Sequence, residues 1–169
     1  MTQNQTPLRR IVTGHNAAGR AVVTHDTVLT PRPIPTGEAT LVWTSTGLPV
    51  NHDDDTDGAA RTVGLTLPGG TVLRVIDLLP GKRSALHRTN SLDYGIVMSG
   101  VVELELDDGV TTQAETGDII VQRGTIHAWR NPSADTTARI AFVLIDAEPA
   151  NAGGASLPPI MPGAAHAAP

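Results

Sequence analysis

Short runs of alternating apolar and polar residues fill most of this 169-residue chain. Residues 102–106 read VELEL, the period-two pattern of a half-buried strand, and Asp108-Gly109 just after them is typical of a two-residue hairpin turn. Similar runs, separated by turns rich in Pro and Gly, occupy residues 9–13, 21–25, 40–45, 71–81, 117–121, 126–131 and 138–146. Helical periodicity is absent, so the pattern predicts an all-β sandwich or barrel.

The runs are distributed unevenly, and this divides the chain into three parts. Residues 1–38 form an arm with short strands, residues 39–146 contain the strands of the barrel, and residues 147–169 are a tail rich in Ala, Gly and Pro. The tail has too few large apolar residues to build a core of its own. It is either an unstructured linker or an extended segment in which Leu157, Ile160 and Met161 lie on the barrel or on a neighbouring subunit.

Composition narrows the function classes. Aromatic residues are only 2% of the chain, so Val, Ile, Leu and Ala must build the core, and the β-branched members of this set favour strands. The net charge is -5 without a cluster of Lys and Arg, which argues against nucleic acid as a partner. Cysteine is absent, which excludes disulfides and thiolate metal ligands. No apolar run reaches the ~20 residues of a membrane span, so we expect a cytoplasmic protein.

Candidate chemistry gathers in residues 81–100 and 117–131. His87, Thr89 and Asp93 are separated by even numbers of residues. On a pleated strand residues two apart share a face, so His87 and Thr89 point to the same side, and Asp93 can rejoin that side after a turn. The same rule puts His127 and Trp129 on one face. If the two segments pair across the barrel, these side chains converge.

These two segments resemble the two sequence motifs of the cupin superfamily. The first motif is matched in spacing by Gly81, His87, Thr89, Asp93 and Gly100. The second is matched by Gly117, Gly124, His127 and Asn131, although it lacks the usual proline and is one residue shorter. The resemblance covers about residues 65 to 146 and implies a jelly-roll β-barrel, also called a double-stranded β-helix, with one internal cavity.

The resemblance also implies a metal site, but with two departures. Cupins usually hold their ion with three His and one Glu, whereas this chain offers Thr89 and Asp93 at two of these positions. His87, Asp93 and His127 remain, which is the ligand composition of a facial triad for a divalent transition metal: iron, manganese, nickel or zinc. The alternative is that the motif has degenerated into a hydrogen-bonded polar cavity without metal.

Three functions fit these residues. The first is a metal-dependent enzyme, of the oxygenase, decarboxylase, lyase or dehydratase type, acting on a small oxygenated or carboxylated compound. The second is a metal-free binding, sensor or accessory barrel without catalysis. The third is a metal-free isomerase with His87 or His127 as base and Tyr94 as acid. Four neighbours are candidates for the pocket wall: Thr89, Arg88, Gln122 and Trp129.

Two further expectations concern the surface. The arm, around residues 9–24, is expected to add strands to a sheet edge and to make the protein a homodimer. The acidic run of residues 52–57 lacks the rhythm of a calcium loop and is expected to be a solvated loop. His15, His25 and His166 lie in the arm and tail without partners in spacing, and we expect them to be structural or exposed.

Overall fold

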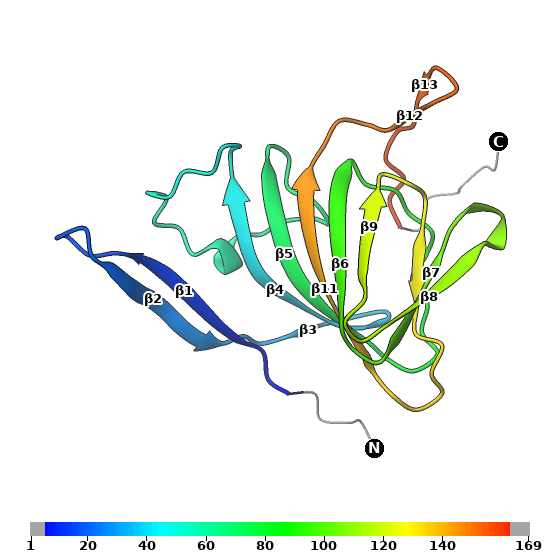
Figure 1. The fold of residues 1–169 in the computed structure, drawn as a ribbon, viewed down its shortest axis with the longest axis horizontal. Helices are drawn as coiled ribbons and strands as arrows, with labels where there is room; N and C mark the ends of the chain where they lie inside the picture. Colours follow the sequence, from blue (N-terminus) through cyan, green and yellow to red (C-terminus); the bar gives the residue numbers. More distant parts are fainter. Residues whose placement is uncertain (1–5, 163–169) are drawn as a thin grey trace.

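The computed structural model describes residues 6–162 and is built almost entirely from strands (Figure 1). The strands are β1 (Arg9–His15), β2 (Ala21–Val28), β3 (Arg32–Ile34), β4 (Gly37–Thr46), β5 (Gly70–Leu78), β6 (Ser91–Ser99), β7 (Val101–Glu105), β8 (Thr111–Glu115), β9 (Ile119–Arg123), β10 (Ala128–Arg130), β11 (Ala138–Asp146), β12 (Asn151–Ala152) and β13 (Ala155–Ser156). Two 3-10 turns, η1 (Gly58–Ala60) and η2 (Asp107–Gly109), complete the elements. Within residues 6–162 no helix is long and apolar enough to span a membrane. The predicted all-β class is confirmed.

Two sheets enclose the core. One has six strands in the order β3-β4-β5-β11-β6-β9, and the other has three in the order β10-β7-β8. Side chains on β5, β6 and β11 alternate between buried and more exposed positions, as expected for strands with one face on a core. Gly95 on β6 lies opposite Phe142 on β11, and a Cβ there would come within 3.3 Å of the Phe142 ring. The buried residues of the core are Val72, Leu78, Val97, Val102, Ala114, Trp129, Ala138, Ile140, Phe142 and Leu144.

The hairpin of β7 and β8 forms, but its turn differs from the prediction. Its last strand pair is Glu105 with Thr111, so five residues connect the strands rather than two. Asp108 and Gly109 have φ values of 56° and 70°, the conformation that this dipeptide favours. Asp107 accepts a hydrogen bond from the Val110 amide within a 3-10 turn, and this adds the extra residues to the loop.

Residues 6–38 are only partly an arm. β1 and β2 form a separate antiparallel hairpin that projects from the rest of the molecule (Figure 1). β3, however, joins the six-stranded sheet through a tight turn in which Ile34 pairs with Gly37. Gly37 is the first residue of β4, so the sheet begins before the predicted boundary at residue 39. A bidentate ion pair between Arg10 and Asp57 ties the hairpin to the loop that contains η1.

The tail contacts the barrel, as one of the two sequence alternatives proposed. β12 and β13 form a small hairpin, and the chain then returns so that Ile160 pairs with Arg88 through two backbone hydrogen bonds of 2.9 Å. Arg88 also donates to the carbonyl of Pro158. Met161 is exposed, whereas Ile160 is held by its backbone pairing with Arg88, the residue after His87.

Candidate functional site

A cavity of about 180 Å³ opens inside the barrel between the two sheets. Its walls are largely apolar, and its polar groups come from β5, β6 and the two segments that contain the motif histidines. The lining residues are Ile34, Thr36, Ala39, Leu65, Arg74, Ile76, Leu78, Ser84, His87, Thr89, Asp93, His127, Trp129, Phe142 and Leu144. An apolar cavity with a few converging polar groups is the usual form of a small-molecule site.

The two motif histidines meet because their segments pair antiparallel. His87 and His127 exchange two backbone hydrogen bonds of 2.9 Å, and the Ser84 amide donates to the carbonyl of Trp129 in the same ladder. Residues that exchange both bonds have Cα atoms about 5.5 Å apart, with side chains on the same side. The two imidazole rings accordingly lie 4.3 Å apart between centroids. The predicted convergence of these residues is therefore present.

Both imidazoles are held by backbone carbonyls at the same ring atom. Nδ1 of His87 is 3.0 Å from the carbonyl oxygen of Ala85, and Nδ1 of His127 is 3.0 Å from that of Thr125. A carbonyl can only accept, so these contacts favour the tautomer in which Nδ1 donates and Nε2 keeps a free lone pair. Nδ1 of His127 also lies 3.1 Å from the side-chain amide nitrogen of Gln122, a donor that favours the opposite tautomer. Burial lowers the pKa of His87, and burial together with the charge of His87 lowers the pKa of His127 to about 4. Near neutral pH the pair is therefore two uncharged bases.

Asp93 supplies the carboxyl group of the cavity. It is 4% exposed, and its Oδ1 has no hydrogen-bond partner among the described residues. Burial raises the pKa of Asp93 to about 6, although the Ser91 hydroxyl and the charge of Arg74 act in the opposite direction. Thr89 is also buried and accepts a hydrogen bond from the Ser91 hydroxyl. Asp93 is thus a proton carrier poised close to neutrality.

The predicted three-ligand metal centre is formed only in part. His87 and His127 fit such a site, because their rings are adjacent and each presents Nε2 when Nδ1 donates to its carbonyl. Yet among residues 6–162 no three His, Asp or Glu side chains are grouped so that they could hold one ion. Asp93 therefore does not complete the set, and its side chain is one methylene shorter than that of the glutamate usual at this position in the motif.

The other predicted site residues divide into two groups. Thr89 and Trp129 line the cavity, as expected, and the Trp129 ring packs on Phe142 and on the edge of His127. Tyr94 does not line it, which corrects the prediction that it acts there as an acid. On β6 successive side chains alternate in direction, so the strand that turns Asp93 inward turns Tyr94 outward, where it is 36% exposed.

Arg88 and Gln122 also lie outside the cavity lining, for different reasons. Arg88 points towards the returning tail rather than inward. Gln122 is buried behind His127, and its side-chain amide donates to the Thr125 carbonyl at 2.8 Å. That carbonyl is the acceptor for His127 Nδ1, so Gln122 helps to fix the orientation of the imidazole.

Arg74 is the cavity residue that the motif analysis missed. It lies on β5, two residues before Ile76 and on the same inward face, between Leu41 and Phe142 on the adjacent strands. A signal was available, because the run TVLRVIDLL contains two charged residues, Arg74 and Asp77, in a strand that should face the core. A charge at such a position is retained where it has a partner.

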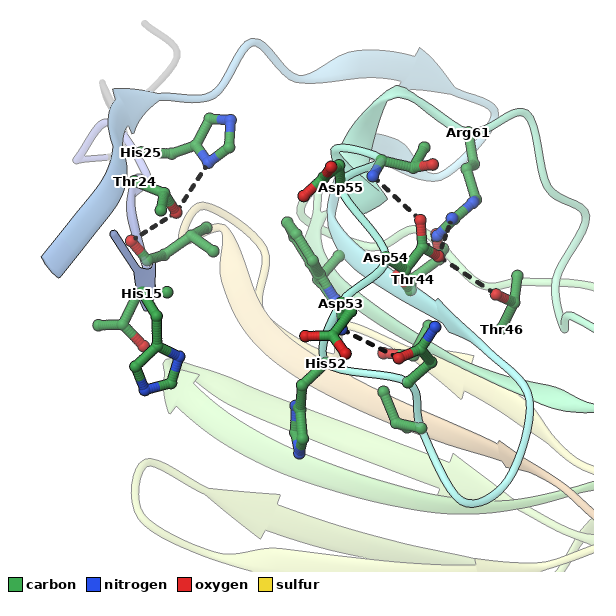
Figure 2. A pocket seen from close by; sticks show the side chains of 18 residues that line it. His15, Thr24, His25, Thr44, Thr46, His52, Asp53, Asp54, Asp55 and Arg61 are labelled. Atoms are coloured by element: carbon green, nitrogen blue, oxygen red, sulfur yellow. Dashed lines mark hydrogen bonds and ion pairs between the residues drawn. The ribbon is translucent and has the colours of Figure 1, made fainter. Parts of the chain in front are cut away.

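A second, larger cavity, which we call the outer groove, lies outside the barrel (Figure 2). It is about 710 Å³ and lies between the β1–β2 hairpin, β4 and the acidic loop. His15, His25 and His52 border it, but they lie apart from one another. Asp54 is bound by Arg61, and Asp57 by Arg10, so these carboxylates of the acidic run are engaged in structural ion pairs. His166 lies outside the described residues.

Comparison with known proteins agrees with this geometry. The family of the cupin domain matches residues 74–144, which contain the strands from β5 to β11 and both motif segments. The phomopsin biosynthesis cluster protein C' of Diaporthe leptostromiformis is 37% identical over 159 residues, covering 89% of this chain and 84% of its own length. The chain belongs to the cupin family.

Two further matches bear on this cupin. A cupin-domain-containing oxidoreductase of Aspergillus ruber, fogC, is 38% identical over 149 residues, covering 81% of this chain and 71% of its own. The cupin domain of Cnp3 from Schizosaccharomyces pombe superimposes with a TM-score of 0.52 over 82% of this chain and 87% of its own, at 7% identity. The second match concerns the fold alone. The predicted family and the double-stranded β-helix architecture are thus confirmed.

Proposed function

We propose that this cupin is an enzyme that acts on a small oxygenated or carboxylated organic compound bound in the inner cavity. The observation that carries the proposal is the pair of buried imidazoles with adjacent rings, each 3.0 Å at Nδ1 from a backbone carbonyl, and in our proposal each ring keeps Nε2 free for the substrate. A positioned base of this kind contributes about 10² to 10⁴-fold to a proton-transfer step. The similarity to a named oxidoreductase supports catalysis over simple binding.

The side chains have distinct roles in this proposal. Nε2 of His127, the more buried imidazole, accepts a proton from the substrate, and Nε2 of His87 hydrogen-bonds to the same part of it. Asp93, with a pKa near 6, returns or shares a proton on the opposite side of the cavity. Trp129 and Phe142 exclude water from the reacting groups and hold the apolar part of the substrate.

The metal-dependent form of the function needs an ion at the two Nε2 atoms. A divalent transition metal bound there would polarise a substrate oxygen. Because the third predicted ligand does not join the histidine pair, we propose that iron, manganese, nickel or zinc is held by two protein ligands only, and hence weakly. The proton transfers described above do not depend on such an ion.

An untargeted assay tests the enzyme proposal without knowledge of the substrate. The purified protein is incubated with a small-molecule extract from a strain of its source organism that lacks the gene, and the mixture is compared by mass spectrometry before and after. We expect the wild-type protein to deplete one compound and His127→Ala to leave it untouched. The mass change identifies the reaction type. If the wild-type protein alters no compound, a binding or accessory barrel takes the place of the enzyme.

Tyr94→Phe is the matched control for that assay. Tyr94 lies on β6 next to Asp93 but on the outer face, so its variant should deplete the compound as fast as the wild-type protein. Loss of turnover in Tyr94→Phe would contradict the placement of the chemistry in the inner cavity.

We also propose that the protein is a homodimer. Two exposed apolar surfaces support this: one on the β1–β2 hairpin and one on the outer face of β6 and β9. On the second, Tyr94 pairs with Val121 and Ile96 with Ile119, and Met98 extends the same face. Exposed apolar patches of this kind mark interaction sites in soluble proteins. Arg10 and Arg61 donate to the carbonyls of Val42 and Thr44, so this part of β4 is not free for strand addition.

Light scattering of the purified protein tests the dimer. The wild-type protein should have twice the monomer mass at tens of micromolar, and Ile119→Lys should have the monomer mass. Val110→Lys, which changes an equally exposed residue in the β7–β8 loop, should remain dimeric. A monomeric wild-type protein would remove this proposal.

A further inference from the structure

Arg74 is a positive charge in the cavity wall without a matching negative partner. Its Nη2 donates to the backbone carbonyls of Gly64 and Leu65 at 2.6 and 2.9 Å, which fixes the guanidinium in place. Its Nε–H is buried and has no hydrogen-bond acceptor among the described residues. No carboxylate in that part of the chain forms an ion pair with it. Arg74 is half-buried, but its Nε–H lacks the acceptor that buried donors usually have in folded proteins, and an anion in the cavity would supply both the acceptor and a countercharge.

Asp93 does not supply that anion on its own. The two side chains line the same cavity, and the charge of each shifts the pKa of the other in the direction that favours ionisation. They do not form a salt bridge, however, and Oδ1 of Asp93 is itself buried without a partner. The cavity thus presents one unsatisfied donor, on Arg74, and one unsatisfied acceptor, on Asp93. If neither atom makes a hydrogen bond, the protein bears the full free-energy cost of removing both atoms from water.

We infer that the cavity takes a small carboxylic acid whose carboxylate binds Arg74 and whose neighbouring hydroxyl group donates to Asp93. The inference deepens the proposed function, since the same cavity holds the substrate. Such a ligand satisfies both orphaned atoms at once. Its remaining part must be apolar and compact, because the walls include Ile76, Phe142 and Leu144 and the volume of about 180 Å³ equals that of about six water molecules.

The approach to Arg74 has the same charge preference. A second cavity of about 400 Å³ shares Ile34, Ala39 and Arg74 with the first, so Arg74 lies where the two adjoin. Arg32 and Arg61 also line this second cavity, and its lining contains no carboxylate, although Arg61 is paired with Asp54 beside it. Positive charge along a cleft raises the local concentration of anions and speeds their entry. Arg32 and Arg74 therefore favour the entry of an anion by this route.

Three related probes test the inference by calorimetry at pH 7.5. The first, 2-hydroxy-4-methylpentanoate, has the carboxylate, the hydroxyl group and an apolar body. The second, its amide, lacks the charge, and the third, 4-methylpentanoate, lacks the hydroxyl group. Charge-assisted hydrogen bonds are the stronger class, so we expect the hydroxy acid to bind about tenfold or more tightly than the amide. The acid without the hydroxyl group should bind more weakly than the hydroxy acid, and Asp93→Ala should remove that difference.

The variant Arg74→Gln separates the charge from the structural role. Its amide can still donate to the carbonyls of Gly64 and Leu65, but it cannot hold a carboxylate by charge. It should lose about tenfold or more in affinity for the hydroxy acid and bind acid and amide equally. Arg83→Gln removes a cation that is paired with Glu105 outside the cavity and should bind like the wild-type protein. Arg74→Lys keeps the charge and should keep the preference for the acid, which covers the case in which Arg74→Gln fails to fold.

The inference is overturned if the wild-type protein binds acid and amide equally, or binds neither acid below about 10 mM, a concentration that corresponds to very weak association. It is also overturned if Arg74→Gln keeps the affinity for the acid or if Arg74→Lys loses the preference. Its failure can be told apart from that of the proposed function. Acid binding as described, without turnover in the extract assay, would remove only the enzyme. Turnover of an uncharged compound that continues in Arg74→Gln would remove only the inference.

Discussion

The inner cavity and the outer groove contain the same kinds of side chains, yet only one of them is arranged as a site. In the cavity, His87 and His127 lie ring to ring and their Nδ1 atoms are fixed by carbonyl groups. In the groove, His15, His25 and His52 come from a projecting hairpin and a loop, and they do not gather (Figure 2). The groove is about four times larger by volume. Size and residue type therefore do not identify the site, whereas convergence on paired strands does.

The carboxylates show the same contrast. Asp54 lines the groove, and Asp57 lies further along the same acidic loop. Asp54 accepts hydrogen bonds from Thr56 and Arg61, and Asp57 accepts them from Arg10, and these bonds lower the pKa of each carboxyl to about 2. In the cavity, Asp93 lacks an arginine partner of this kind, and burial raises its pKa to about 6. The carboxylates of the acidic loop serve the fold because their charge is already neutralised. Asp93 keeps an unsatisfied oxygen that a ligand can use.

The largest effect expected from this contrast is on activity. His127→Ala and His87→Ala should each lower turnover of the depleted compound by about 10²-fold or more, because each removes a positioned base. His52→Ala, in the groove, should leave turnover unchanged. Rates are measured by mass spectrometry on the extract, with unfolding curves to show that each variant is folded. If His52→Ala loses as much turnover as the two cavity variants, the arrangement of the histidines in the cavity does not determine activity.

The second effect is on stability in acid. The folded pKa of His127 is about 4, below its ordinary value of 6.5, so the unfolded chain takes up a proton first as the pH falls. The stability that His127 contributes is therefore lost between about pH 6.5 and pH 4, by about 3 kcal/mol for the metal-free protein across the whole window. Asp93 acts in the opposite sense below about pH 6, because burial raises its folded pKa from 3.8 to about 6 and the folded protein takes up that proton first. The difference in unfolding free energy between wild type and His127→Gln, measured in urea, should therefore change by about 3 kcal/mol across this window. The prediction is wrong if His127→Gln has the same slope as the wild-type protein.

The third effect is on metal affinity. Wild-type protein loaded with iron, manganese, nickel or zinc should lose most of the ion on desalting, because two histidines are its only protein ligands. The double variant with Thr89→His and Asp93→Glu restores the ligand set usual in cupins and should bind at least about tenfold more tightly. Elemental analysis measures both. A full equivalent of metal retained by the wild-type protein would show that Asp93 completes the centre after all.

The smallest effect is expected in the acidic loop beside the groove. Asp57→Asn weakens the pair with Arg10, which is only 6% exposed, and should cost about 1 kcal/mol of stability near neutral pH. The folded pKa of Asp57 is lowered to about 2, so the contribution is present above its ordinary pKa of 3.8 and is lost as the pH falls towards 2. Asp55→Asn, on the same exposed loop, is the matched control and should change little. A difference between wild type and Asp57→Asn that persists at pH 2 would contradict this account.

The alternation of apolar and polar residues determined the fold class, since a strand with one buried face must repeat every two residues. The resemblance to the two cupin motifs also predicted that His87 and His127 face one cavity, provided that their two segments pair across the barrel. The two-residue period of a strand also predicts that the side chain of Tyr94 points outward. It is one residue from Asp93, and a strand cannot turn both inward.

Other features depended on distances that no spacing encodes. Whether Asp93 joins the histidine pair depends on how the strands pack around the cavity, and whether Ile160 lies on Arg88 depends on how the tail returns to the barrel. The role of Arg74 could not be predicted either. An arginine in a strand can be a structural residue or part of a ligand site, and the groups around its guanidinium decide between the two. The sequence by itself determined which side chains could face the core. Only the tertiary structure decided which of them meet and which are left without a partner, since partners far apart in the chain are brought together by packing rather than by local pattern.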